Sequence, residues 1–164
     1  MSVVRRDAGE ELSIGDYTGL VGRSEWTGDA YCILDQVVPP GLLTPVHSHA
    51  VEDQVVFVLD GEITCWVDGD RETLGTGDYA VRPAGLPHSL WNAGEQPVRM
   101  LEITNPGDRF QEYVGKVGEL VDAGKANAET IGALAGEYGI SFHPDLTAEL
   151  EAELQLGTGG SFWK

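Results

Sequence analysis

The chain has 164 residues and a mass of 17.6 kDa, which is enough for one domain with its own hydrophobic core. Hydrophobic residues make up 41% of it, so extensive disorder is not expected. The 27 acidic and 10 basic residues give a formal charge of −17, which disfavours binding to nucleic acid or to an anionic membrane.

The start of the chain and its cysteines indicate the compartment. The first 30 residues contain no apolar run typical of a signal peptide, and no later run is long enough to span a bilayer. Cys32 and Cys65 lie far apart in strand-like contexts and are predicted to be small core residues or free thiols. We therefore expect a cytoplasmic protein.

Residues from about 17 to 105 have the pattern of β-strands throughout. From Asp60-Gly61 to Ala93-Gly94, turn signals recur every eight or nine residues, which is typical of an all-β sandwich or barrel. The clearest part is an apolar strand, Val55 to Leu59, followed by the Asp-Gly pair of a tight hairpin. The β pattern occurs once, so a single barrel with an N-terminal arm is predicted over 1–105.

After Pro106-Gly107 the hydrophobic period changes to that of helices. A first helix is expected from Asp108, which would cap it, to a stop at Gly124. A second is expected over 127–138 and a short third over 145–154. These helices, within 106–164, are predicted to pack on the barrel as part of the same domain.

His47 and His49 stand one residue apart, so in a strand both imidazoles point to the same face. Imidazole is a common ligand of Fe, Ni, Co, Cu and Zn, and such a face offers two adjacent donors. The pair alone is a weak signal, because hydrogen-bonded histidine pairs are frequent in proteins without a metal.

Two longer motifs surround this pair. The first has a glycine, five residues, His-x-His, four residues, Gln54, six residues and a final glycine. The second is GDYAVRPAGLPHSLWN. With these spacings the chain resembles the cupin superfamily, whose fixed motif positions correspond to Gly41, His47, His49 and Gly61, then Gly77, Pro83, Gly85, His88 and Asn92.

The resemblance implies an all-β cupin fold, a double-stranded β-helix or jelly-roll barrel, with a C-terminal helical appendage. It implies that His47, His49 and His88 bind a divalent transition metal, which could be Fe, Ni, Co, Mn, Cu or Zn. The segment from Asn105 to Phe142 looks like the C-terminal part of single-domain quercetin 2,3-dioxygenase-like cupins. A homodimer is a further expectation from the resemblance.

Position 54 departs from the family. Metal-dependent cupin dioxygenases commonly have a glutamate there, which completes the metal site and takes a proton from the substrate. An amide oxygen can still coordinate, but an amide is no general base near neutral pH. Gln54 is the first candidate for the fourth ligand and for a catalytic role, and Asp53 is the alternative in a shifted register. A bare three-histidine site is the third possibility.

The substrate pocket is expected to be apolar and aromatic. Its candidate residues are Val56, Val58, Trp66, Trp91, Phe110 and Phe142. The fourth histidine, His143, belongs to neither motif and is expected at the surface or in helix packing.

Three functions are compatible with these residues. The first is a quercetinase-like dioxygenase that cleaves a flavonol, β-diketone or other enolisable or phenolic small molecule with dioxygen. The second is a non-redox polyketide cyclase or isomerase that uses the metal as a Lewis acid. The third is a non-catalytic cupin that binds a small molecule, which the three converging imidazoles disfavour.

Overall fold

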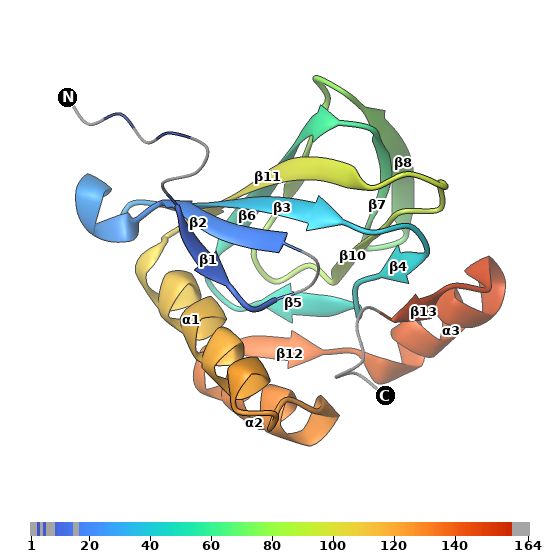
Figure 1. Cartoon of the computed structure of the whole chain (residues 1–164). Coiled ribbons are helices and arrows are strands. Elements are labelled where there is room, and N and C mark those ends of the chain that lie inside the picture. The colour runs from blue at the N-terminus through green and yellow to red at the C-terminus, as the bar shows by residue number, and fades with distance from the viewer. Residues whose placement is uncertain (1–2, 4, 6–8, 15–16, 159–164) are drawn as a thin grey trace.

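The computed structural model describes residues 3, 5, 9–14 and 17–158, which form two β-sheets, three α-helices and a short 3₁₀ helix, η2 (Ser24–Thr27) (Figure 1). The strands are β1 (Glu10–Leu12), β2 (Tyr17–Gly22), β3 (Cys32–Val38), β4 (Leu42–Leu43), β5 (His47–His49), β6 (Asp53–Asp60), β7 (Glu62–Val67), β8 (Asp70–Gly75), β9 (Tyr79–Arg82), β10 (His88–Trp91), β11 (Val98–Asn105), β12 (Ile140–Phe142) and β13 (Gly157–Thr158).

The strands build a jelly roll from two sheets. One sheet has six strands in the order β1-β2-β3-β11-β6-β9. The other has the order β12-β5-β10-β4-β13, and β7 joins it by pairing with β10 on one side and β8 on the other. The predicted β-rich jelly-roll fold is confirmed, although the two sheets do not close into one continuous barrel.

The three predicted helices are present as α1 (Asp108–Asp122), α2 (Ala128–Glu137) and α3 (Pro144–Leu154). In Figure 1, α1 and α2 lie side by side next to β12, and α3 lies beside β13. The predicted cap of α1 is wrong, because Gly107 takes the N-cap position and Asp108 is the first helical residue. Gly124 ends the helix with a φ of 63°, as predicted.

Gly107 explains how the chain passes from β11 into α1. A Cβ atom at this position would lie 2.2 Å from the backbone nitrogen of Cys32, a distance that no side chain tolerates. Glycine therefore allows the start of α1 to pack directly against the start of β3. This contact brings the first turns of α1 to the end of the jelly roll where β5 lies.

Three hydrophobic clusters hold the elements together. Between the sheets lies a cluster that includes Val56, Val58, Cys65 and Met100. A second joins α1, α2 and β12 to β2 and β3, and includes Cys32. In the third, α3 covers the outer face of the second sheet. Both cysteines are buried and free, as predicted.

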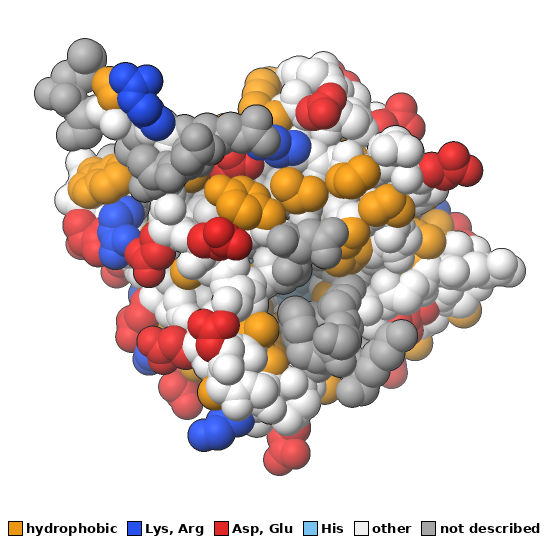
Figure 2. Space-filling view, in the orientation of Figure 1, with side chains coloured by type: hydrophobic (Ala, Val, Ile, Leu, Met, Phe, Trp, Pro, Cys, Tyr) orange, Lys and Arg blue, Asp and Glu red, His pale blue; other side chains and the backbone are white. Residues whose placement is uncertain are grey.

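The surface carries the acidic charge. Asp and Glu side chains are spread over the face shown in Figure 2, with Lys and Arg at fewer places. Among the described residues, no helix is long and apolar enough to cross a membrane. Tyr79 and Val81 are exposed on the edge strand β9, and the expected homodimer stays a prediction.

Candidate metal centre

Three histidines from two neighbouring strands meet at one end of the jelly roll. His47 and His49 are the two ends of β5, and His88 is the first residue of β10. The antiparallel register sets His88 directly opposite His47. One ligand atom from each of the three side chains lies within 4.8 Å of the other two. The sequence motifs thus converge in space.

The hydrogen bonds of His47 and His88 leave one nitrogen of each of these two rings for a ligand. Nδ1 of His47 contacts the carbonyl oxygen of Pro45 at 2.8 Å, and Nδ1 of His88 contacts that of Leu86 at 3.1 Å. A carbonyl only accepts, so each Nδ1 carries the proton and each Nε2 has a free lone pair. The buried Nε2 atoms of His49 and His88 have no hydrogen-bond partner.

Burial favours the neutral form of His47 and of His88. Because enclosure by the protein disfavours the charged ring, it lowers the pKa of His47 to about 3, and the neighbouring His49 adds to this. Burial also lowers the pKa of His88, with the positive charge of Arg82 as the next cause. A metal binds the neutral ring, so these residues need not lose a proton to bind one near pH 7. The donor set fits a divalent transition metal.

Gln54 lies on the inner face of β6 and is buried. Its amide nitrogen donates to Glu102 Oε1 at 3.0 Å and to Thr104 Oγ1 at 3.2 Å. Its amide oxygen is buried without a hydrogen-bond partner. An unpartnered buried acceptor is costly, so this oxygen is available as a neutral metal donor.

Asp53, the alternative to Gln54, has the opposite orientation. It is exposed, and its Oδ1 accepts a hydrogen bond from the backbone N–H of Ala84 at 2.8 Å. Side chains alternate along β6, so residues 53 and 54 cannot both face inward. The structure places Gln54 inside and Asp53 outside.

Glu52 is a site residue that sequence reasoning considered only as a neighbour. Its carboxylate is 2% exposed, and Oε2 lies 3.6 Å from Nδ1 of His49. Burial by itself raises the pKa of Glu52, but its contacts with His49 and with backbone N–H groups outweigh this and lower the pKa. Glu52 thus lies on the Nδ1 side of the His49 ring, the side that a ligand bound through Nε2 would leave free.

Glu102 and Arg82 form a buried ion pair beside Gln54, with Arg82 Nη2 2.9 Å from Glu102 Oε2. Arg82 is also the cross-strand partner of Gln54 in the pairing of β6 with β9. Sequence reasoning missed this pair. The alternation of β11 offered a signal, because Glu102 falls on the same face as the buried Val98 and Met100.

A cavity of about 170 Å³ opens onto His47 and His49. It lies where α1, α2 and β12 cover the end of the jelly roll. Apart from the two histidines, none of the described residues that line it is acidic or basic. They are Ile14, Thr44, Pro45, Phe110, Tyr113, Val114, Val117, Ile131, Ile140 and Phe142.

The six predicted pocket residues fall into three groups. Phe110 and Phe142 line the cavity. Val56 and Val58 are fully buried between the sheets. Trp66 and Trp91 belong to the cluster under α3, on the outer face of the second sheet, and are not among the described residues that line the cavity. Alternation along β7 is interrupted at Cys65 and Trp66, which are both buried.

His143 lies outside the cluster. Its Nε2 is 2.9 Å from Oγ of Ser48, which is on the opposite face of β5 from the two cluster histidines. This contact joins the start of α3 to β5. His143 is therefore a packing residue of the helix, in agreement with the expectation from sequence.

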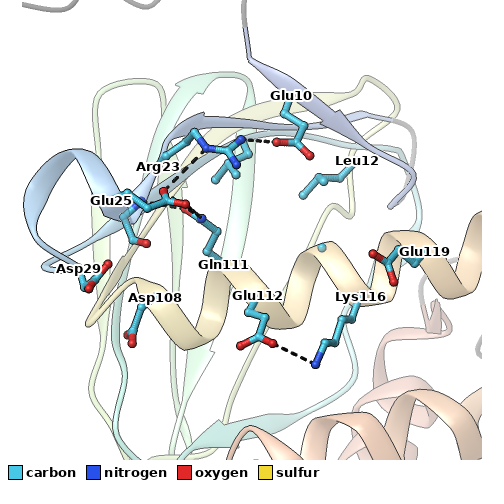
Figure 3. Close-up of a pocket in the computed structure, with 13 residues that line it drawn as sticks. Glu10, Leu12, Arg23, Glu25, Asp29, Asp108, Gln111, Glu112, Lys116 and Glu119 are labelled. Carbon is cyan, nitrogen blue, oxygen red and sulfur yellow. Dashed lines mark hydrogen bonds and ion pairs between the residues drawn. The ribbon is translucent and has the colours of Figure 1, made fainter.

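A larger hollow of about 450 Å³ lies on the surface between β1, η2 and α1 (Figure 3). Its lining is mainly acidic. Its two cations, Arg23 and Lys116, each form an ion pair with a carboxylate of the lining, Lys116 with Glu112 at 3.0 Å. Figure 3 shows both cations paired with carboxylates of the same lining, and the histidine cluster is therefore the stronger candidate site.

Comparison with known proteins agrees with this geometry. Residues 34–104, which contain all three histidines, Gln54 and Glu102, match the model of the cupin domain. This part of the chain is a cupin domain. This cupin matches a quercetin 2,3-dioxygenase from Bacillus subtilis (strain 168) with 34% identity over 114 residues, which are 68% of the chain and 33% of that protein.

Two further matches agree with the family. Gentisate 1,2 dioxygenase 1 from Aquipseudomonas alcaligenes is 32% identical over 97 residues, 58% of the chain and 27% of that protein. The chain therefore spans a third or less of these curated relatives. A crystal structure of a predicted oxalate decarboxylase from Thermotoga maritima has a TM-score of 0.59 at 20% identity, covering 63% of this chain and 98% of that one. At that identity the likeness is one of fold.

Proposed function

We propose that this cupin binds a divalent transition metal through His47, His49 and His88 and acts as a dioxygenase on a small, neutral enol or phenol. The observation that carries the proposal is that three imidazoles with free Nε2 atoms meet beside an apolar cavity. The dioxygenases among its relatives support the reaction class. A bound metal would supply a Lewis acid for an oxygen of the substrate.

The residues around the histidines define which substrates can react. None of the described buried carboxylates, Asp35, Glu52 and Glu102, is among the cavity-lining residues, and Gln54 cannot take a proton. The site therefore needs a substrate whose own hydroxyl is acidic. A 1,3-diketone or an activated phenol meets this condition, because its enolate or phenolate forms easily on a Lewis acid.

The charge and the volume of the cavity further limit which substrates can bind. A phosphate or carboxylate substrate would require a cationic side chain, and the described lining has none. The volume of about 170 Å³ is below the roughly 300–1,000 Å³ typical of sites for drug-sized ligands. We therefore favour a substrate with one or two rings, or a short diketone, over a three-ring flavonol.

Oxygen uptake by metal-loaded protein tests the proposal. Protein loaded separately with Fe, Ni, Co, Mn, Cu or Zn is given acetylacetone, a two-ring β-diketone, catechol and quercetin, and metal occupancy is measured on the same samples. Uptake with a neutral diketone or phenol, absent in His88→Ala, supports the proposal. No uptake on the whole panel at full occupancy contradicts it.

A cyclase or isomerase is the second candidate, and Gln54 is the observation that favours it. An amide brings no charge, so the metal would keep its full positive charge and polarise a carbonyl more strongly. Loss of an enolisable diketone at the same rate under strict anaerobiosis, with zinc as the bound metal, would support this candidate. A requirement for oxygen excludes it.

A further inference from the structure

We infer that Glu102 and Thr104 are positioning residues that hold the Gln54 amide with its oxygen toward the metal, and that they make this site select an amide over a carboxylate at position 54. The inference rests on the metal site proposed above. It explains why position 54 has a glutamine in place of the family's glutamate: Glu102 and Thr104 lie against this side chain.

The first step is the direction of the amide. Glu102 and Thr104 both come from the inner face of β11, and Thr104 is directly opposite Gln54 in the register. Glu102 accepts from Arg82 through Oε2 and from the NH₂ end of Gln54 through Oε1. With the nitrogen 3.0 and 3.2 Å from these two acceptors, the amide oxygen points away from both.

The second step is how the two oxygens of Glu102 are hydrogen-bonded. Arg82 donates to its other oxygen at 2.9 Å, and both side chains are buried. With Arg82 at one oxygen and the Gln54 amide nitrogen at the other, both oxygens of Glu102 accept hydrogen bonds. Arg82 pairs with Gln54 across β9 and β6, and Gly85, three residues further on, donates its backbone N–H to the carbonyl oxygen of His49 at 2.7 Å, so the pair lies near the histidine cluster.

The third step concerns the buried polar atoms that have no hydrogen-bond partner. Among the described residues, the buried atoms without a hydrogen-bond partner include Oε1 of Gln54 and Nε2 of His49 and His88. One neutral oxygen and the imidazole nitrogens are thus left as donors at the same end of the jelly roll. A metal held there would satisfy the amide oxygen and the two Nε2 atoms together, provided that the amide keeps this direction.

A carboxylate at position 54 would conflict with this arrangement. It would bring two acceptors toward Glu102 and Thr104, and Glu102 has no hydrogen to offer. Moving the carboxylate from position 102 to position 54 would remove the conflict, because the amide at 102 could donate to it. Arg82, the cross-strand partner of position 54, would then balance the new charge.

A double-mutant cycle tests the inference with four proteins: wild type, Gln54→Glu, Glu102→Gln and the double variant. Two quantities are measured, the melting temperature of the metal-free protein and the affinity for Co²⁺. We expect Gln54→Glu to melt about 5 °C or more below wild type, because a buried polar group loses its partner. Glu102→Gln should melt lower as well, since Arg82 is left unpaired.

The double variant should regain most of the lost melting temperature and bind Co²⁺ at least as tightly as wild type. Thr104→Val, which removes one acceptor, should weaken Co²⁺ binding by about 10-fold, the lower end of the effect of residues that orient a ligand. Asp53→Asn removes a neighbouring negative charge on the outer face and should change neither quantity.

The inference is overturned if Gln54→Glu melts and binds Co²⁺ like wild type, or if the double variant is no better than the worse single one. These outcomes differ from failure of the proposed function. If wild type binds no Co²⁺, the metal site itself and the ligand role of Gln54 are both wrong, and the melting temperatures alone then decide the hydrogen-bond arrangement.

Discussion

His88 faces His47 across the antiparallel pair of β10 and β5, with their ring centroids 4.4 Å apart. The two residues are 41 positions apart in the sequence, yet the register makes them neighbours. Backbone carbonyls hold both rings in the same tautomer, with Nε2 free. This relationship preorganises the cluster proposed as the ligand set, and each member can be tested by its own substitution.

Removing His88 should abolish tight metal binding. We expect His88→Ala to lower the affinity for Co²⁺ or Zn²⁺ by more than about 100-fold, because even residues that only orient a ligand contribute 10–100-fold. His143→Ala is the matched control, since His143 contacts Ser48 outside the cluster, and it should bind like wild type. Competition with a chelating dye measures both. Equal affinities for the two variants would contradict the assigned ligand set.

Glu52→Gln should weaken metal binding without removing it. The carboxylate of Glu52 lies 3.6 Å from Nδ1 of His49, so its loss frees the ring to rotate. The expected decrease in affinity is about 10- to 100-fold. Asp53→Asn changes the adjacent but exposed residue and should have no effect. Isothermal titration with Zn²⁺ separates the two, and a larger effect at position 53 would show that the inward and outward faces are exchanged.

Acid should destabilise the metal-free protein. A histidine of the unfolded chain titrates near pH 6.5, whereas burial lowers the pKa of His47 to about 3 and also lowers that of His88. Between these values the unfolded state binds more protons, so stability rises with pH and is lost as pH falls from about 6.5 toward 3.

Urea unfolding midpoints between about pH 7.5 and pH 5.5, above the range in which ordinary carboxylates titrate, measure this slope. The variant with both His47→Gln and His88→Gln should have a shallower slope than wild type. A slope that is unchanged in the variant would mean that other groups cause the acid sensitivity.

Trp66 should contribute to the stability of the fold and not to metal binding. Its side chain lies in the cluster beneath α3 and is 8% exposed. We expect Trp66→Ala to lower the free energy of unfolding by about 3–5 kcal/mol, the usual cost of truncating a large buried aromatic residue. Affinity for Co²⁺ should stay within about 2-fold of wild type. Weaker metal binding at unchanged stability would show that Trp66 belongs to the metal site.

Local sequence patterns were sufficient for the elements, and the resemblance to cupins was sufficient to group the three histidines. The 3.6-residue period predicted the helices, because each buries one face, and Asn127 and Gly139 mark the ends of α2 through their capping and turn chemistry. The resemblance of the two motifs to those of cupins predicted that His88 would join His47 and His49.

Only the tertiary structure decided what surrounds the histidines. The letters VEDQ do not reveal which of Asp53 and Gln54 faces inward, because a shift of one residue exchanges the faces of β6. The amide direction of Gln54 depends on Glu102, which is 48 residues away. The cavity depends on how α1 and β12 pack against β5. Such contacts join residues distant in sequence and depend on the final packing, which no local pattern records.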